Sequence, residues 1–147
     1  MIFIGLAVAV FTTEYFIKRW IEKNKSFESK DSILGDRVII RKHHNKGTAG
    51  QFLEKYQGLI SVLAFIFTII MALVFAFTLT KHGNNGLKTG LALLLGGAFS
   101  NTYDRLKRKY VVDYITFKVK GKLGTLVFNI ADFCIMIGAL MVCVFQK

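Results

Sequence analysis

Two long apolar runs and two shorter ones alternate with polar segments along the chain. Residues 58–80 run for 23 positions without a charge, and because about 20 apolar residues span a bilayer core, this run predicts a transmembrane helix. Residues 123–146 form a similar run with one charge, Asp132. Residues 1–13 and 89–103 are shorter, but a polar helix end can lengthen each. We predict four transmembrane helices, at about residues 1–22, 58–80, 87–105 and 126–146.

The connecting segments carry strand-like patterns. Residues 24–57 are polar and mixed, and they contain a β-branched run at residues 38–40 followed by an Asn-Lys-Gly turn. This pattern predicts one or two short strands on the membrane surface. Residues 107–125 are basic and have strand character in YVVDYITFKVKG. With no linker to a second domain, we expect residues 1–147 to form one integral membrane domain of the all-α class.

A signal peptide is the alternative interpretation of residues 1–13. A signal peptide has basic residues before its apolar core and a small-residue cleavage site after it. Here Lys18 and Arg19 follow the core, and Glu14 interrupts its end. We therefore favour a first helix that belongs to the folded protein.

The net charge of +11 is concentrated in two segments. Of the 20 Lys and Arg residues, ten lie between Lys18 and Lys55 and seven between Arg105 and Lys122. A basic protein can bind nucleic acid, but beside four predicted spans we expect anionic lipid headgroups or a solvated surface instead. Because basic loops usually stay cytoplasmic, the charge bias alone would place both segments on the cytoplasmic side.

The cysteines and histidines indicate neither a disulfide nor a metal site. Cys134 and Cys143 lie nine residues apart, on nearly opposite faces of one helix, so they cannot bond to each other. His43, His44 and His82 have no companion Cys or Glu at ligand spacing. We expect no metal and no cofactor.

Only three acids lie in the last 93 residues, namely Asp104, Asp113 and Asp132. Acids near bilayer depth are costly and usually mark function. Asn101 precedes Asp104 by three residues, and Asn129 precedes Asp132 by three, so each pair shares a helix face. Because one loop joins the two helices, all five residues lie on the same membrane side and can converge.

Two carboxylates at one site predict peptide hydrolysis without a metal. Held close together, they cannot both ionise easily, so one keeps its proton. The ionised acid can take a proton from water, and the protonated acid can polarise the carbonyl and donate to the leaving amine. The structural alternatives are that Asp104 pairs with Arg105 and that Asp132 bonds the neighbouring backbone. We favour the structural alternative for Asp104, and chemistry for Asp113 and Asp132.

Several motifs resemble those of the lipoprotein signal peptidases, also called signal peptidase II. GGAFSNTYDR resembles the family's GGAxGNxxDR, YVVDYI resembles its VVDFI, and VFNIADFCIMIG resembles its FNxADxxIxxG. Upstream, HNKGTAG matches NxGxAF at Asn45, Gly47 and Ala49, and Glu14 and Lys18 in EYFIK stand where the family has DQxTK. The resemblance spans most of the chain and is sharpest in its last third.

The resemblance implies a bacterial membrane aspartyl endopeptidase with four transmembrane helices and a small extracytoplasmic β-cradle. Such an enzyme cuts the signal peptide from a prolipoprotein just before its diacylglyceryl-modified cysteine. Asp113 and Asp132 would be the catalytic dyad. The resemblance also implies residues that support the site or bind substrate: Glu14, Lys18, Asn45, Gly47, Asn101, Asp104, Arg105, Asn129 and Ala131. It places the active site toward the extracytoplasmic face of the cell membrane, against the charge bias, and we expect a monomer.

Three departures from the family motifs leave other functions open. Glu14 replaces an aspartate, Ser100 replaces the glycine before Asn101, and Gly50 replaces the phenylalanine of NxGxAF. We expect activity with an altered substrate preference. The alternative is a non-catalytic homologue that binds a signal peptide or lipid without cutting it. A proton-coupled transporter using Asp132 is disfavoured, because the acids cluster at one membrane face.

Overall fold

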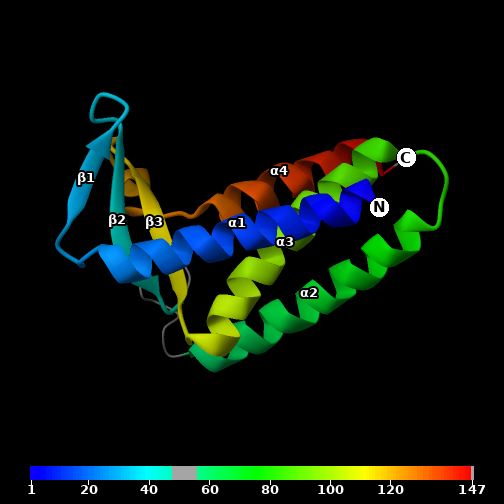
Figure 1. Cartoon of the computed structure of the whole chain (residues 1–147), viewed down its shortest axis with the longest axis horizontal. Helices are drawn as coiled ribbons and strands as arrows, with labels where there is room; N and C mark the ends of the chain where they lie inside the picture. Colours follow the sequence, from blue (N-terminus) through cyan, green and yellow to red (C-terminus); the bar gives the residue numbers. More distant parts are fainter. Residues whose placement is uncertain (48–55, 147) are drawn as a thin grey trace.

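The computed structural model describes residues 1–47 and 56–146. It consists of four helices and one small sheet (Figure 1). The helices are α1 (Ile2–Asn24), α2 (Gln57–Leu79), α3 (Asn85–Lys107) and α4 (Ile130–Phe145), with a short 3-10 turn, η2 (Lys122–Thr125), before α4. The strands are β1 (Lys30–Ile33), β2 (Val38–Asn45) and β3 (Val111–Phe117). The helices form an elongated bundle that carries the sheet at one end and both chain termini at the other (Figure 1).

The sheet is antiparallel, in the order β1-β2-β3. It confirms the strands expected within residues 24–57 and 107–125. Residues 48–55, which include Gly50, lie outside the described part of the chain. The register pairs Asn45 with Val111 and His43 with Asp113. Since opposed residues of an antiparallel pair point to the same face, β2 and β3 place Asn45 and Asp113 on one side of the sheet.

Helix α4 begins later than the apolar run predicts. The run indicates a helix over residues 126–146, whereas the structure starts it at Ile130. The four residues before it do not form a helix, because Phe128 pairs with β3. The Phe128 carbonyl accepts hydrogen bonds from the backbone amides of Tyr114 and Ile115, both at 2.8 Å. Asn129 is therefore the N-cap of α4, and Asp132 lies in its first turn.

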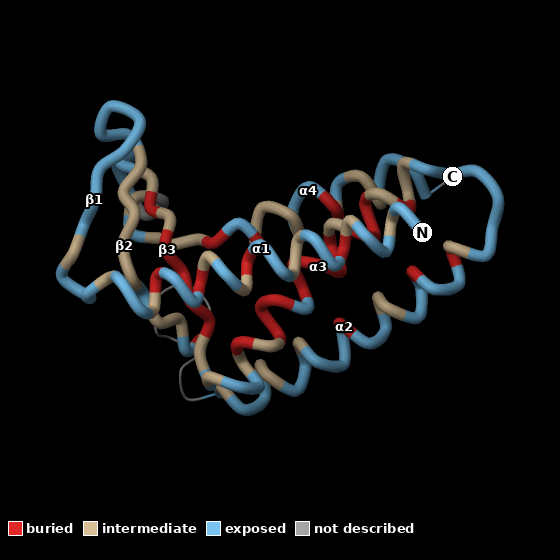
Figure 2. Tube along the Cα trace, in the orientation of Figure 1, coloured by how far each residue is buried: buried red, intermediate tan, exposed pale blue. Residues whose placement is uncertain are grey.

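Helix α3 lies at the centre of the bundle and packs against each of the other three helices. Figure 2 shows that its residues are the most extensively buried. Two glycines let α3 and α4 touch backbone to backbone. A Cβ atom on Gly97 would lie 2.5 Å from the carbonyl oxygen of Ala131, and one on Gly138 would lie 2.5 Å from that of Gly90. This close approach brings the polar end of α3 beside the start of α4.

Helix α2 presents its apolar side chains outward. Leu73 is 66% exposed and Ile70 52% exposed, and of the described helices α2 alone has the length and apolar composition of a membrane span. Helix α4 is apolar but shorter. Four helices are thus confirmed, while composition alone identifies one span. Helices α1 and α3 are less apolar because each carries buried polar residues at the sheet end.

Candidate active site

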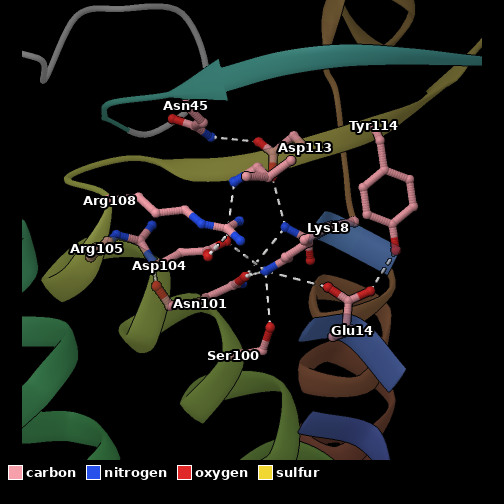
Figure 3. A network of polar contacts seen from close by, with 12 residues as sticks. Glu14, Lys18, Asn45, Ser100, Asn101, Asp104, Arg105, Arg108, Asp113 and Tyr114 are labelled. Atoms are coloured by element: carbon pink, nitrogen blue, oxygen red, sulfur yellow. Dashed lines mark hydrogen bonds and ion pairs between the residues drawn. The ribbon is translucent and has the colours of Figure 1, made fainter. Parts of the chain in front are cut away.

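Strands β2 and β3 hold Asp113 in a pocket of amides. Asp113 is 2% exposed, and its two carboxylate oxygens accept hydrogen bonds from the side-chain amides of Asn129 at 2.7 Å and Asn45 at 2.8 Å. The amide of Asn45 is itself fixed, since its oxygen accepts from the backbone N–H of Gly47 at 3.1 Å. The structure therefore brings the predicted residue Asn45 to Asp113 (Figure 3), and the predicted residue Gly47 holds Asn45 in place.

The first turn of α4 positions Asp132. Asn129 and Asp132 form a reciprocal capping box: the Asn129 side chain accepts from the Asp132 backbone N–H at 2.9 Å, and Asp132 Oδ2 accepts from the Asn129 backbone N–H at 3.0 Å. This contact agrees with the structural alternative for Asp132. Its other oxygen, Oδ1, accepts from the side-chain amide of Asn101 at 2.8 Å. One oxygen of Asp132 thus caps the helix while the other faces α3.

A chain of amides links the two acids. Asn129 Nδ2 donates to Asp113 and lies 3.3 Å from Asn101 Oδ1, and Asn101 Nδ2 donates to Asp132. We call Asp113 and Asp132, with Asn45, Asn101 and Asn129, the amide-lined pair. Among the described residues, no Lys or Arg forms an ion pair with either acid. Burial, and then the nearby charge of Asp132, raise the pKa of Asp113 to about 7.

A second group of buried acids lies beside the amide-lined pair. Lys18 Nζ lies 3.3 Å from Glu14 Oε2 and 3.1 Å from Asp104 Oδ2, and Arg108 lies 3.1 Å from Asp104 Oδ1. Glu14, Lys18 and Asp104 are each at most 2% exposed. We call Glu14, Lys18, Asp104 and Arg108 the ionic cluster. Its two acids are balanced by two cations.

The ionic cluster orients the side-chain amide of Asn101, which donates to Asp132. Lys18 Nζ also donates to Ser100 Oγ at 3.0 Å and to Asn101 Oδ1 at 2.8 Å. Because the oxygen of Asn101 is held by Lys18, its amino group faces Asp132. The hydroxyl of Ser100, which departs from the family motif, is thus used as an acceptor for Lys18.

The prediction that Asp104 pairs with a cation was correct, but the partner expected, Arg105, was wrong. Asp104 pairs with Arg108 instead, since residues four apart share a helix face and adjacent residues do not. It also pairs with Lys18, which lies on α1. Arg105 is half-buried and donates to the backbone carbonyl of Asn101 at 3.4 Å. Ala131 is fully buried where its carbonyl meets Gly97, so it shapes the site through helix packing.

Sequence reasoning did not identify Arg108 or Tyr114 as residues of the site. Tyr114 is 3% exposed, and its hydroxyl donates to Glu14 Oε1 at 2.5 Å. The sequence contained a signal for this contact. Tyr114 occupies the position of phenylalanine in the VVDFI motif, and Glu14 occupies the position of aspartate in the DQxTK motif. Elsewhere in the described chain, no group of three or more His, Cys, Asp or Glu residues could hold a metal ion.

The chain is similar to one group of proteins over nearly its full length. The family described as signal peptidase (SPase) II matches residues 6–146. A lipoprotein signal peptidase of Clostridium tetani is 33% identical over 129 residues, which cover 87% of this chain and 81% of that protein. A lipoprotein signal peptidase of Moorella thermoacetica is 31% identical over 144 residues, covering 97% and 91%. A bacterial membrane enzyme solved by the in meso method at 2.3 Å resolution has a TM-score of 0.80 and 26% identity, covering 97% of this chain and 85% of that one.

Proposed function

The chain belongs to the signal peptidase II family of aspartic peptidases, which cleave the signal peptides of prolipoproteins, and we propose that Asp113 and Asp132 perform this cleavage. The observation that carries the proposal is the amide-lined pair. Both acids accept hydrogen bonds from neutral amides, and no Lys or Arg among the described residues lies at ion-pair distance from either, although Arg105 is close enough to attract both charges. Such a pair can hold one proton between two acids, as hydrolysis without a covalent intermediate requires.

The surroundings of the two acids favour a division of labour. Asp113 is the more buried acid, and its pKa of about 7 keeps about half of it protonated at pH 7. Asp132 is half-buried, accepts two N–H bonds and lies at the positive N-terminal end of α4. Asp132 is therefore the base that takes a proton from water, and Asp113 is the acid that polarises the scissile carbonyl.

The reaction then needs no other protein atom. Water loses a proton to Asp132, and its oxygen bonds to the carbonyl carbon while the proton of Asp113 moves toward the carbonyl oxygen. Collapse of the tetrahedral intermediate breaks the C–N bond, and the leaving amine takes up a proton from the pair. Asn101 and Asn129 hold the carboxylates in place and offer no competing charge.

The outward apolar surface of α2 supports a membrane location for the whole bundle. We propose that all four helices cross the bilayer and that residues 1–147 form one domain. Helices α1, α2 and α3 have 23 residues each, or about 35 Å, which exceeds a hydrocarbon core of about 30 Å. Helix α4 has 16 residues and reaches about 24 Å, so its first turn places Asp132 just inside the membrane boundary.

This depth fits a substrate that is itself anchored in the membrane. The signal helix would lie against the bundle with its diacylglyceryl chains in the bilayer, and the bond before the modified cysteine would reach the sheet end. We place that end on the extracytoplasmic face, following the family motifs and against the bias of the basic segments. Exposed basic side chains near the sheet end, such as Lys107 and Lys109, would attract anionic headgroups. The unit that cleaves would be a monomer.

A cleavage assay with purified protein in nanodiscs tests the catalytic assignment. The substrate is a diacylglyceryl-modified prolipoprotein, followed by its gel mobility. We expect Asp113→Asn and Asp132→Asn each to lower the rate by about 10² to 10⁴-fold, while both stay folded. Asp36→Asn is the matched control. Asp36 is exposed, and its ion pair is a long one, at 3.8 Å, with the exposed Lys118.

Two results would contradict the proposal. Parent-like cleavage by either dyad variant would remove that acid from the mechanism. A folded parent that cleaves no prolipoprotein, with several cleavage-site sequences tried, would favour the non-catalytic homologue.

A further inference from the structure

Tyr114 joins three elements at the active site through one hydroxyl group. It lies on β3 directly after Asp113, donates to Glu14 Oε1 on α1 at 2.5 Å, and accepts from the backbone N–H of Ile130 at 3.3 Å. Figure 3 shows the Tyr114 ring reaching down from β3 to Glu14. We propose that Tyr114 is a positioning residue that sets the separation of Asp113 and Asp132. This inference rests on the proposed function of those two acids.

The contact with Ile130 fixes the helix that carries Asp132. The first backbone amides of a helix have no acceptor within the helix, and Ile130 is the first residue of α4. The Tyr114 hydroxyl supplies an acceptor for that amide. Backbone bonds to Phe128 also tie β3 to this segment, but they end before the helix begins. The hydroxyl is therefore a second contact, beside the Asn129 side chain, that ties the first turn of α4 to the strand of Asp113.

The contact with Glu14 fixes the orientation of the hydroxyl. Glu14 has no solvent exposure, and its other oxygen is paired with Lys18 at 3.3 Å. Because an ionised carboxylate only accepts hydrogen bonds, the Tyr114 proton points to Glu14 and a lone pair remains for Ile130. A hydrogen bond to a charged group is also stronger than one between neutral groups.

Glu14 connects this contact to the other arm of the site. Lys18, which pairs with Glu14, also holds Asn101 Oδ1 at 2.8 Å, and Asn101 donates to Asp132. The Glu14 carboxylate thus acts on Asp132 from two directions, through Tyr114 and the start of α4, and through Lys18 and Asn101.

Glu14 and Tyr114 are both departures from the family motifs, and each needs the other. A phenylalanine at 114 would leave Glu14 Oε1 buried without a donor among the described residues. An aspartate at 14 would be one methylene shorter and would leave the Tyr114 hydroxyl without its acceptor. Changing both residues removes the unpaired hydroxyl, but it gives the Ile130 amide no new acceptor.

Steady-state kinetics and pH profiles of prolipoprotein cleavage test the inference. The variants are Tyr114→Phe, Glu14→Asp and the double variant, with Tyr110→Phe as the control. Tyr110 stacks on His44, and its hydroxyl has no hydrogen bond to another described residue. We expect Tyr114→Phe to lower kcat by about ten- to a hundredfold, since small displacements of reacting groups cost this much, with KM changed less than about twofold.

The pH profile separates positioning from a loss of folded protein. If the acids move apart, their mutual repulsion weakens, and the acidic and basic limbs of the kcat/KM profile of Tyr114→Phe move closer together. Loss of folded protein would scale the rate without moving the limbs. Because both changes break the same contact, we expect the double variant to lose no more kcat than Tyr114→Phe alone, and Tyr110→Phe to match the parent in both readouts.

Parent-like limbs in Tyr114→Phe, or losses that simply add in the double variant, would overturn the inference while the proposed function stands. If Tyr114→Phe does not fold, Glu14→Asp carries the test, since it disturbs the same hydroxyl without removing it: limbs that move closer together support the inference, and parent-like limbs overturn it. A parent that cleaves no prolipoprotein overturns both proposals.

Discussion

Asp104 and Asp113 are equally buried acids with opposite surroundings. Each is 2% exposed. Asp104 lies in the ionic cluster, between Lys18 at 3.1 Å and Arg108 at 3.1 Å. Asp113 lies in the amide-lined pair, between Asn45 at 2.8 Å and Asn129 at 2.7 Å. The partners of an acid, and not its burial, therefore decide whether its charge is fixed or its proton can be exchanged.

Asn101 belongs to the amide-lined pair and also contacts the ionic cluster. The difference in surroundings between Asp104 and Asp113 is therefore maintained across a short distance. Lys18 holds the oxygen of Asn101, and Asp132 accepts from its nitrogen. A neutral amide in this place transmits orientation from the ionic cluster to the dyad without bringing a cation into direct contact with it. The ionic cluster stabilises geometry, and the amide-lined pair keeps an acid that can give up a proton near neutral pH.

The largest expected effect is on stability, and it has opposite signs in the two groups. Asp104→Asn leaves the buried Lys18 and the half-buried Arg108 with one acid fewer, so we expect the free energy of unfolding to fall by about 3–5 kcal/mol. Asp113→Asn removes a buried acid without a cation, so we expect no loss of stability at about pH 8, or a small gain. Thermal unfolding in matched nanodiscs measures both. Equal losses in the two variants would show that the surroundings do not differ as described.

A smaller effect is expected from the amides of the dyad. Asn129→Ala removes the donor to Asp113 and one half of the capping box. Because leaving a buried polar group without its partner costs about 1–3 kcal/mol, we expect kcat/KM to fall by about ten- to a hundredfold. The matched control is Asn24→Ala, since the exposed Asn24 amide donates only to the Trp20 carbonyl at 2.9 Å. Loss of activity in the control to the same extent would refute a specific role for Asn129.

The smallest expected effect per pH unit is the pH dependence of stability that Asp113 adds. Its pKa is about 7 in the folded protein and about 4 in an unfolded chain, so the folded state binds more protons between these values. The contribution of Asp113 to stability is therefore fully present below about pH 4 and is lost as the pH rises toward 7, by at most about 1.4 kcal/mol per pH unit.

The difference in melting temperature between the parent and Asp113→Asn, measured from pH 5 to 8, reports this effect. We expect the parent to lose stability relative to the variant as the pH rises. A difference that stays constant would mean that Asp113 titrates outside this window.

The sequence predicted the elements better than their ends or their partners. Apolar runs identified four helices, because burial in lipid or protein needs apolar surface whatever the tertiary contacts. The start of α4 was missed by four residues, since Phe128 pairs with Ile115 of β3 across a connection that no local pattern reveals. Length and hydropathy identify only α2 as a span, because α4 is too short and because α1 and α3 carry polar residues, some of which pair with one another inside the bundle.

Site prediction had the same limit. Three-residue spacing correctly predicted that Asn101 and Asp104 share a face of α3, since both contact Lys18, but it could not identify this partner. Lys18 lies on another helix and captures Asp104 through a tertiary contact. Motif resemblance indicated Asn45 and Gly47 as site residues, and the structure gives the geometry: Asn45 bonds Asp113, and Gly47 fixes Asn45. The link between Tyr114 and Glu14 was not predicted, because each departure was considered alone.

Infrared titration of the carboxyl groups tests most directly whether the amide-lined pair holds one proton. The parent, Asp113→Asn and Asp104→Asn are each titrated from about pH 4 to 9 in nanodiscs, following the band of protonated carboxyl groups. We predict one protonated carboxyl that persists in the parent and in Asp104→Asn at about pH 6, two units above an ordinary aspartate. It should titrate with a pKa of about 7 and be absent from Asp113→Asn. A parent without a protonated carboxyl at that pH, or a band that survives in Asp113→Asn, would contradict the proton-sharing pair.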